Sequence, residues 1–171
     1  MKTFLFLFMM LPFLACSPFG VKSSGRNPKP DGPVTSYEYQ LSGTMRYPIT
    51  FYEVDRDSTG AVRIAWSKAN SGDIRVIRGP EDFFHRVDEY VSQYKLYKLK
   101  NHYVPRARVL DGKMWHAYIR FQHNSISAGG SNAQAPRELM AGIDAINQYI
   151  QSLIDASGEE DIIETRSHDD R

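Results

Sequence analysis

An apolar stripe near the C-terminal end of the chain constrains the fold most strongly. Its members follow one another at intervals of four, three, four and three residues, the repeat of one helix face: Leu139, Ile143, Ile146, Ile150 and Leu153. A second stripe predicts a helix of about four turns that begins near Pro80: Phe83, Val87, Tyr90 and Tyr94. Both helices must bury these stripes against another layer.

Runs in which apolar and polar residues alternate predict strands with one buried face. They occupy residues 37–41, 62–66 and 114–121, and the β-prone run at 49–54 and the short run at 74–77 predict two more strands. The turn residues at 55–60 predict that the runs 49–54 and 62–66 form a hairpin. We therefore expect an α+β fold. Its predicted form is a two-layer sandwich, in which two amphipathic helices cover an antiparallel sheet of about four to five strands.

Residues 1–15 have the layout of a signal peptide, because Lys2 is followed by an uncharged run from 4 to 15. The run is too short to be a permanent membrane span. Residues 13–16 resemble the lipobox of bacterial lipoproteins, which implies that Cys16 becomes the lipid-linked first residue of the mature chain. Ser17 after this cysteine resembles lipoproteins sent to the outer membrane. The alternative is a plain secreted protein cut near Ala15.

Three segments are expected after the leader. Residues 16–34 begin with the cysteine that the lipobox resemblance implies is lipidated. The rest of this segment is rich in Ser, Gly and Pro, which predicts a flexible tether. Residues 35–157 contain all of the periodic runs and predict a single α+β domain. Residues 158–171 carry six acids and two bases and predict a disordered acidic tail. An acidic interaction arm is the alternative for the tail.

Composition limits the function. The 21 bases nearly balance 20 acids, and Lys2 belongs to the leader, so the rest of the chain gives no reason to expect nucleic acid as a partner. One cysteine excludes an internal disulfide and a cysteine-rich zinc site. The five histidines have no metal-ligand spacing, and there is no GxSxG motif. We predict no catalytic residue, no metal and no cofactor.

Two regions are candidates for ligand binding. Residues 95–113 hold six bases and one acid, interleaved with tyrosines, which is typical of an anion or glycan contact surface. A helix end followed by a charged connector is the alternative. Residues 126–132 predict a glycine-rich loop before the last helix, where backbone N–H groups bind a carboxylate or phosphate; an ordinary long turn is the alternative. The candidate residues are Lys98, Lys100, Tyr103, Arg106, Arg108, Trp115, Gly129, Gly130, Ser131 and Asn132.

The lipobox, together with four further segments, resembles small uncharacterised lipoproteins of Gram-negative bacteria. These segments are 47–48, 109–115, 126–132 and 147–149. The resemblance implies a cell-envelope location and brings no activity, cofactor or catalytic residue.

We therefore expect a lipid-anchored, non-enzymatic envelope domain that binds a protein or a glycan. One alternative is a small envelope hydrolase or transferase, which would need His116 or His123 together with Asp111 and a loop serine. The other alternative is a structural subunit of an envelope assembly.

Overall fold

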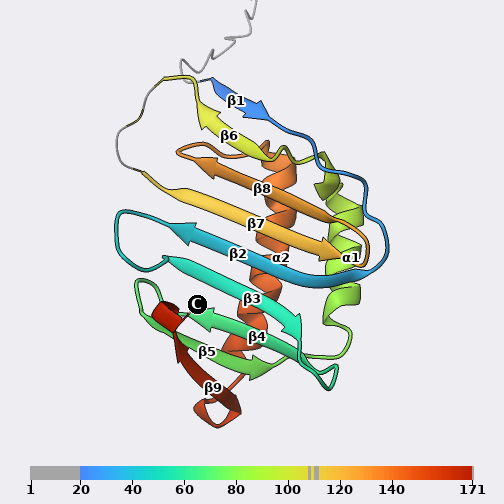
Figure 1. The fold of residues 1–171 in the computed structure, drawn as a ribbon, viewed down its shortest axis with the longest axis vertical. Helices are drawn as coiled ribbons and strands as arrows, with labels where there is room; N and C mark the ends of the chain where they lie inside the picture. The colour runs from blue at the N-terminus through green and yellow to red at the C-terminus, as the bar shows by residue number, and fades with distance from the viewer. Residues whose placement is uncertain (1–19, 108, 110–111, 171) are drawn as a thin grey trace, which may run out of the picture.

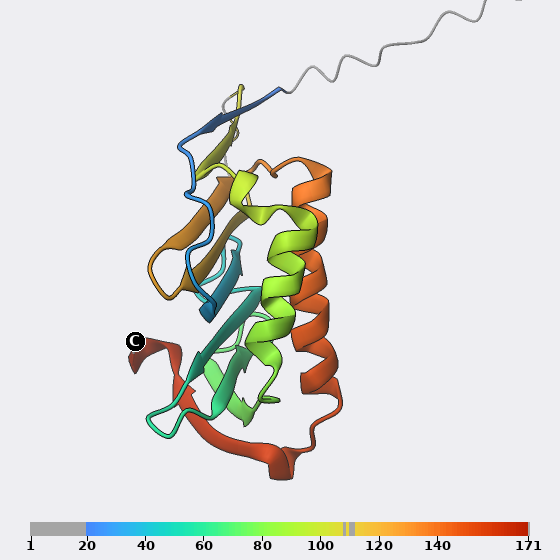
Figure 2. The same cartoon turned by 90° about the vertical axis from the view of Figure 1, so that its right-hand side faces the viewer.

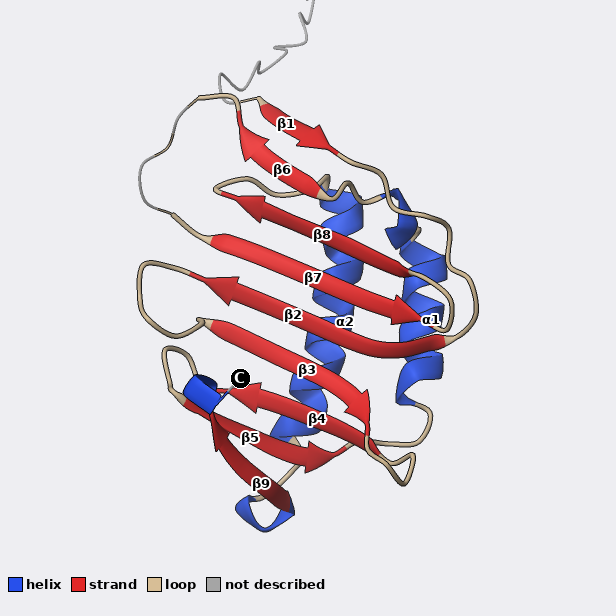
Figure 3. Cartoon of the chain, viewed as in Figure 1, coloured by secondary structure: helices blue, strands red, loops and turns tan. Residues whose placement is uncertain are grey.

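A sheet of nine strands runs through the part of the chain that the structure describes (Figures 1 and 3). The computed structural model describes residues 20–107, 109 and 112–170. Across the sheet the strand order is β1-β6-β8-β7-β2-β3-β4-β5-β9. The strands are β1 (Val21–Ser24), β2 (Val34–Ser42), β3 (Thr50–Arg56), β4 (Val62–Ser67), β5 (Asp73–Arg78), β6 (His102–Pro105), β7 (Met114–Phe121), β8 (Ser125–Ser131) and β9 (Ile162–Ser167).

Two helices, α1 (Phe83–Tyr94) and α2 (Arg137–Asp155), cover the same face of the sheet (Figure 2). Short 3₁₀ turns follow at η1 (Leu96–Lys98), η2 (Glu159–Asp161) and η3 (His168–Asp170). The apolar stripe of α2 lies against the sheet, and Ile143, Ile146 and Ile150 are fully buried. Within the described part of the chain, no helix has both the length and the apolar character that a membrane span needs.

The α+β class and both helices are confirmed, whereas the expected number of strands is wrong. The sheet has nine strands and not four or five, and it is mixed because β6 pairs in parallel with β8. The additional strands are β1, β6, β8 and β9. These strands are short, or rich in Ser and Gly, or charged, so they lack the alternating pattern of a half-buried strand. They are held in the sheet by backbone pairing with their neighbours.

The tether prediction is wrong for residues 20–34. Val21–Ser24 forms β1 and pairs antiparallel with β6. Asn27 is 7% exposed, although no apolar residue surrounds it in the sequence. A buried amide that satisfies backbone groups can order a polar segment without any hydrophobic pattern. The predicted signal peptide and Cys16 lie outside the described residues.

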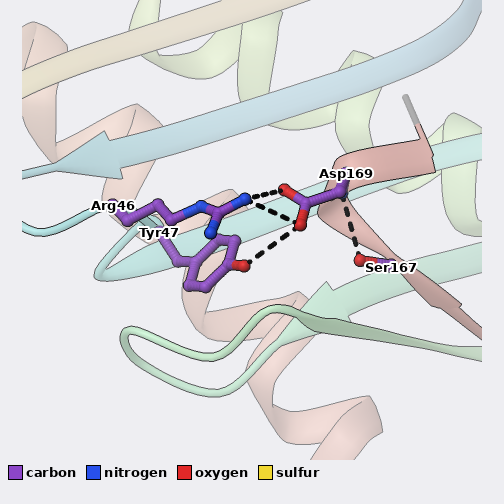
Figure 4. A network of polar contacts seen from close by, with 4 residues as sticks. All are labelled: Arg46, Tyr47, Ser167 and Asp169. Atoms are coloured by element: carbon purple, nitrogen blue, oxygen red, sulfur yellow. Dashed lines mark hydrogen bonds and ion pairs between the residues drawn. The ribbon is translucent and has the colours of Figure 1, made fainter.

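The tail prediction is also wrong. Residues 162–167 form β9, which pairs antiparallel with β5. The acids of this region form ion pairs with bases on β4, on β5 and on the β2–β3 connection: Glu164–Arg63, Glu159–Arg75 and Asp169–Arg46. Figure 4 shows the last of these, where Arg46 donates to both carboxylate oxygens of Asp169 at 3.0 and 2.9 Å. Charge that favours disorder in an isolated segment is neutralised here by tertiary contacts.

The face of the sheet opposite the helices has two parts. Near β9, a small apolar cluster of Phe51, Ala65, Ile74 and Val76 is buried. His168 of η3 packs its ring against Phe51, with 5.0 Å between the ring centroids. Over β2, β7 and β8 the same face carries polar side chains. This polar part is called the open face below, and it contains one of the candidate sites.

Buried tyrosines between the sheet and α2 predict a loss of stability in alkali. Burial, with a smaller contribution from Asp144, raises the pKa of Tyr39 to about 12. A raised pKa in the folded state means that its contribution to stability is complete below pH 10 and is lost as the pH rises toward 12. Between pH 8 and pH 11.5 we expect the unfolding free energy of Tyr39→Phe to fall by about 1 to 2 kcal/mol less than that of the wild type, after allowance for partial solvent screening.

The measurement is guanidinium unfolding of both proteins at pH 8, 10 and 11.5. At pH 8 the side chain is neutral in both states, so this point separates the packing effect of the substitution from ionisation. An equal alkaline loss of stability in the two proteins would contradict the assignment to Tyr39.

Candidate functional site

A basic pocket of about 660 Å³ lies where two segments distant in the sequence meet. Lys95, the left-handed residue that ends α1 (φ 54°), turns the chain into η1 and toward the sheet. This turn brings residues 97–100 against residues 26–29. The pocket is lined by Arg26, Asn27, Pro28, Lys29, Tyr97, Lys98 and Lys100.

Among the described residues, four cations line the basic pocket and no carboxylate does so. Among the residues that the structure describes, none of these four has an acidic partner within 4 Å. Lys98 is exposed and Lys100 is half-buried. Like charges that gather without a counter-ion repel one another, and a bound anion relieves this repulsion. The electrostatics of the pocket therefore favour an anionic ligand.

Asn27 holds the two segments together. Its side-chain amide donates to the carbonyl oxygens of Leu99 (2.9 Å) and Ser127 (3.0 Å). Its Oδ1 accepts from the Ser127 backbone N–H (2.9 Å) and from Asn101 Nδ2 (3.0 Å). These bonds use the full donor and acceptor capacity that a buried amide must satisfy. The network joins the basic pocket to β8.

A second hollow, of about 530 Å³, lies on the open face beside this network, and we call it the histidine pocket. In the sheet register, His102 on β6 and His116 on β7 are both partners of Gly129 on β8. Gln40 on β2 is the next partner in the row, opposite His116. The lining consists of Gln40, Ser42, Asn101, His102, Met114, Trp115, His116, Ser127, Gly129, Gly130 and Ser131.

His116 and Ser127 are in contact in the histidine pocket, with 3.3 Å between Nε2 and Oγ. The tautomer decides which group donates. This pair alone is weak support for the hydrolase alternative, because the described lining residues include no carboxylate to orient the imidazole. The Ser127 N–H is already committed to Asn27 and is not free to stabilise an oxyanion. The chemistry that the arrangement offers is hydrogen bonding to a ligand.

The structure separates the basic and aromatic candidates. Lys98 and Lys100 lie together in the basic pocket. Tyr103 is 3% exposed, and its hydroxyl accepts from the Lys100 N–H at 2.8 Å. It therefore fixes the backbone of Lys100 and does not itself line the pocket. Arg106 lies at the β1 end of the sheet, where its N–H donates to the Gly20 carbonyl. Arg108 lies outside the described residues.

The glycine-rich candidates lie on a strand and not on the predicted loop. Gly129, Gly130 and Ser131 belong to β8 and line the histidine pocket. Trp115 is 6% exposed on the helix-covered face, and its Nε1 donates to the Ala133 carbonyl at 2.8 Å. Asn132 follows β8 with φ 53° and lines a different hollow, next to Asp144. The segment has low strand propensity, but pairing with both β6 and β7 holds it extended.

Several site residues were not among the sequence candidates. Arg26 and Lys29 were assigned to the tether, although their charge matches that of the 95–113 region. Asn27 and Asn101 gave no signal, because one asparagine in a polar segment resembles any other. On the open face, the side chains that the sequence did not single out are Gln40, Ser42, His102 and Met114.

No group of three or more histidine, cysteine or acidic side chains that could hold a metal ion occurs in the described part of the chain. No protein-family model matches the chain, and no curated protein matches it.

Proposed function

We propose that this chain is a lipid-anchored protein of the cell envelope whose folded domain binds an anionic glycan. The observation that carries the proposal is the basic pocket, where four cations converge without an acidic partner among the described residues. A lipid-linked Cys16 would hold the domain at a membrane surface. The lipobox-like residues 13–16 support this anchor, and the resemblance to Gram-negative lipoproteins supports an outer-membrane location.

The shape of the site favours a glycan over a second folded protein. A hollow of about 660 Å³ is in the range of small-ligand sites. Protein interfaces are broader surfaces that bury about 800 Å² on each partner. Tyr97 adds an aromatic ring to the lining, and aromatic rings pack against the apolar faces of sugars. A sugar that carries phosphate or carboxylate would satisfy both the size and the charge.

Binding is tested with the domain from residue 17 onward and two sugars that differ only at C6, where one carries a carboxylate and the other a neutral hydroxymethyl group. We expect glucuronate to shift backbone amide resonances around residues 26–29 and 97–100, and glucose to leave them in place. The shifts should weaken as salt rises from 50 to 300 mM. Equal response to both sugars, or shifts elsewhere on the domain only, would overturn the proposal. Binding only to anionic vesicles would point to a lipid headgroup instead.

The anchor is tested separately by palmitate labelling in cells. We expect the wild-type chain to incorporate label and to sediment with membranes, and Cys16→Ala to do neither, because the thiol is the attachment atom. Cys16→Ser is the matched control for side-chain size and should behave like Cys16→Ala. Labelling of the alanine variant would contradict the anchor without affecting the basic pocket.

A further inference from the structure

We infer that the ligand extends from the basic pocket into the histidine pocket, with its anionic group in the first and a neutral, hydroxyl-rich sugar ring in the second. This inference rests on the proposed function and specifies its ligand as a sugar phosphate of at least two rings. It assigns a role to the hollow of about 530 Å³ on the open face.

The two pockets are neighbours across a single hydrogen-bond network. Asn27 lines the basic pocket, while Asn101 and Ser127 line the histidine pocket. Asn27 bonds directly to both of them, at 3.0 Å to Asn101 and at 2.9 and 3.0 Å to Ser127. Lys100 of the basic pocket is also the chain neighbour of Asn101. The two pockets are therefore adjacent, with the Asn27 network between them.

The floor of the histidine pocket exists because residue 129 has no side chain. A Cβ at Gly129 would lie 2.9 Å from the Trp115 carbonyl oxygen and 3.5 Å from the His116 Cδ2 atom. Real Cβ contacts do not approach a backbone atom so closely, so glycine is required here. Gly129 therefore places no side chain in the row between His102 and His116, and it lines the hollow together with them.

The lining of this hollow suits a neutral sugar ring. No Lys, Arg, Asp or Glu occurs among its described lining residues. Imidazole, amide and hydroxyl groups both donate and accept hydrogen bonds, as the hydroxyl groups of a sugar do. Gln40 Nε2 donates to Ser42 Oγ at 2.8 Å, which places these two groups side by side on β2. Met114, 55% exposed, supplies an apolar surface at the rim.

The test measures the affinity of the domain for inorganic phosphate, trehalose and trehalose 6-phosphate by calorimetry or amide-shift titration. We expect trehalose 6-phosphate to bind at least 10-fold more tightly than phosphate, because the rings add contacts in the histidine pocket. His102→Ala together with Gln40→Ala should reduce this gain to less than 3-fold and leave phosphate affinity unchanged. His123→Ala, at the turn between β7 and β8, is the matched control and should leave all three affinities unchanged.

The outcomes separate this inference from the proposed function. If phosphate and trehalose 6-phosphate bind equally, the basic pocket holds an anion and the extension into the histidine pocket is wrong. If neither binds, the anion site fails, and with it this inference. If the double variant weakens phosphate as strongly as trehalose 6-phosphate, the histidine pocket acts only through the fold, and the assignment of a sugar ring to it is overturned.

Discussion

Replacing Lys98 and Lys100 with glutamate should weaken binding of trehalose 6-phosphate and of inorganic phosphate on the order of 50-fold, from the loss of charge-assisted hydrogen bonds. The double variant changes the charge of the lining by four, from four cations to two cations and two anions, and so removes the net attraction of the pocket for an anion. Both side chains project from a short segment whose backbone is held by Asn27 and Tyr103, so the substitutions leave those supports in place. The loss should be largest at low salt, where screening is weakest.

A variant with the same change in charge elsewhere separates local contacts from overall charge. Lys68→Glu together with Lys113→Glu alters two exposed lysines outside both pockets. It should retain more than half of the wild-type affinity, since long-range effects of exposed charges are screened. Equal losses in the two double variants, measured by the same titration at 50 and 150 mM salt, would refute a site at the basic pocket.

Ending the chain at Ser157 should cost the domain about 3 to 5 kcal/mol of unfolding free energy, by the burial of apolar area that is lost. The truncation removes β9, which pairs with β5, and η3, whose His168 packs on Phe51 of the small apolar cluster opposite the helices. It also leaves β5 as an unpaired edge, which favours aggregation. Removal of a disordered tail would leave the unfolding free energy unchanged. An unchanged free energy in urea unfolding would therefore contradict the pairing of β9 with the sheet.

Glu164→Gln is the point control for the truncation. It removes the ion pair with Arg63 and keeps the strand, and it should cost no more than about 1 kcal/mol because both partners are partly exposed. Hydrogen exchange gives a second readout. Amide protons on β9 that are bonded to β5 should be protected in the full chain and in the Glu164→Gln variant.

The periodic elements could be predicted because their signal is local. The stripe of Ile143, Ile146 and Ile150 predicts α2, and the alternation at 114–121 predicts β7, since each pattern needs only the repeat of its own backbone. β9 was not predicted, because the acids at 158–171 favour a solvated tail. The bases of β4 and β5 that pair with these acids become their neighbours only in the folded sheet. β8 was not predicted because Gly and Ser carry no strand pattern.

The site was predictable only in part for the same reason. Lys98 and Lys100 are recognisable from charge, and the structure keeps them together. Tyr103 lies close to them in sequence, but its side chain is buried in the core. This could not be predicted, because the position of a residue in the sequence does not tell which face of a short strand its side chain occupies. The row His102, Gly129 and His116 depends on the register of three strands, and register is a property of the assembled sheet.

The amino-acid sequence alone determined the α+β class, the two helices and the basic character of the 95–113 region, because helical and strand repeats and charge are properties of short segments. The tertiary structure decided that residues 20–34 and 158–170 belong to the fold, and that two separate groups of bases share one pocket. Those outcomes depend on which distant backbone and side-chain groups satisfy one another, and Asn27, with partners at 99, 101 and 127, is the clearest case.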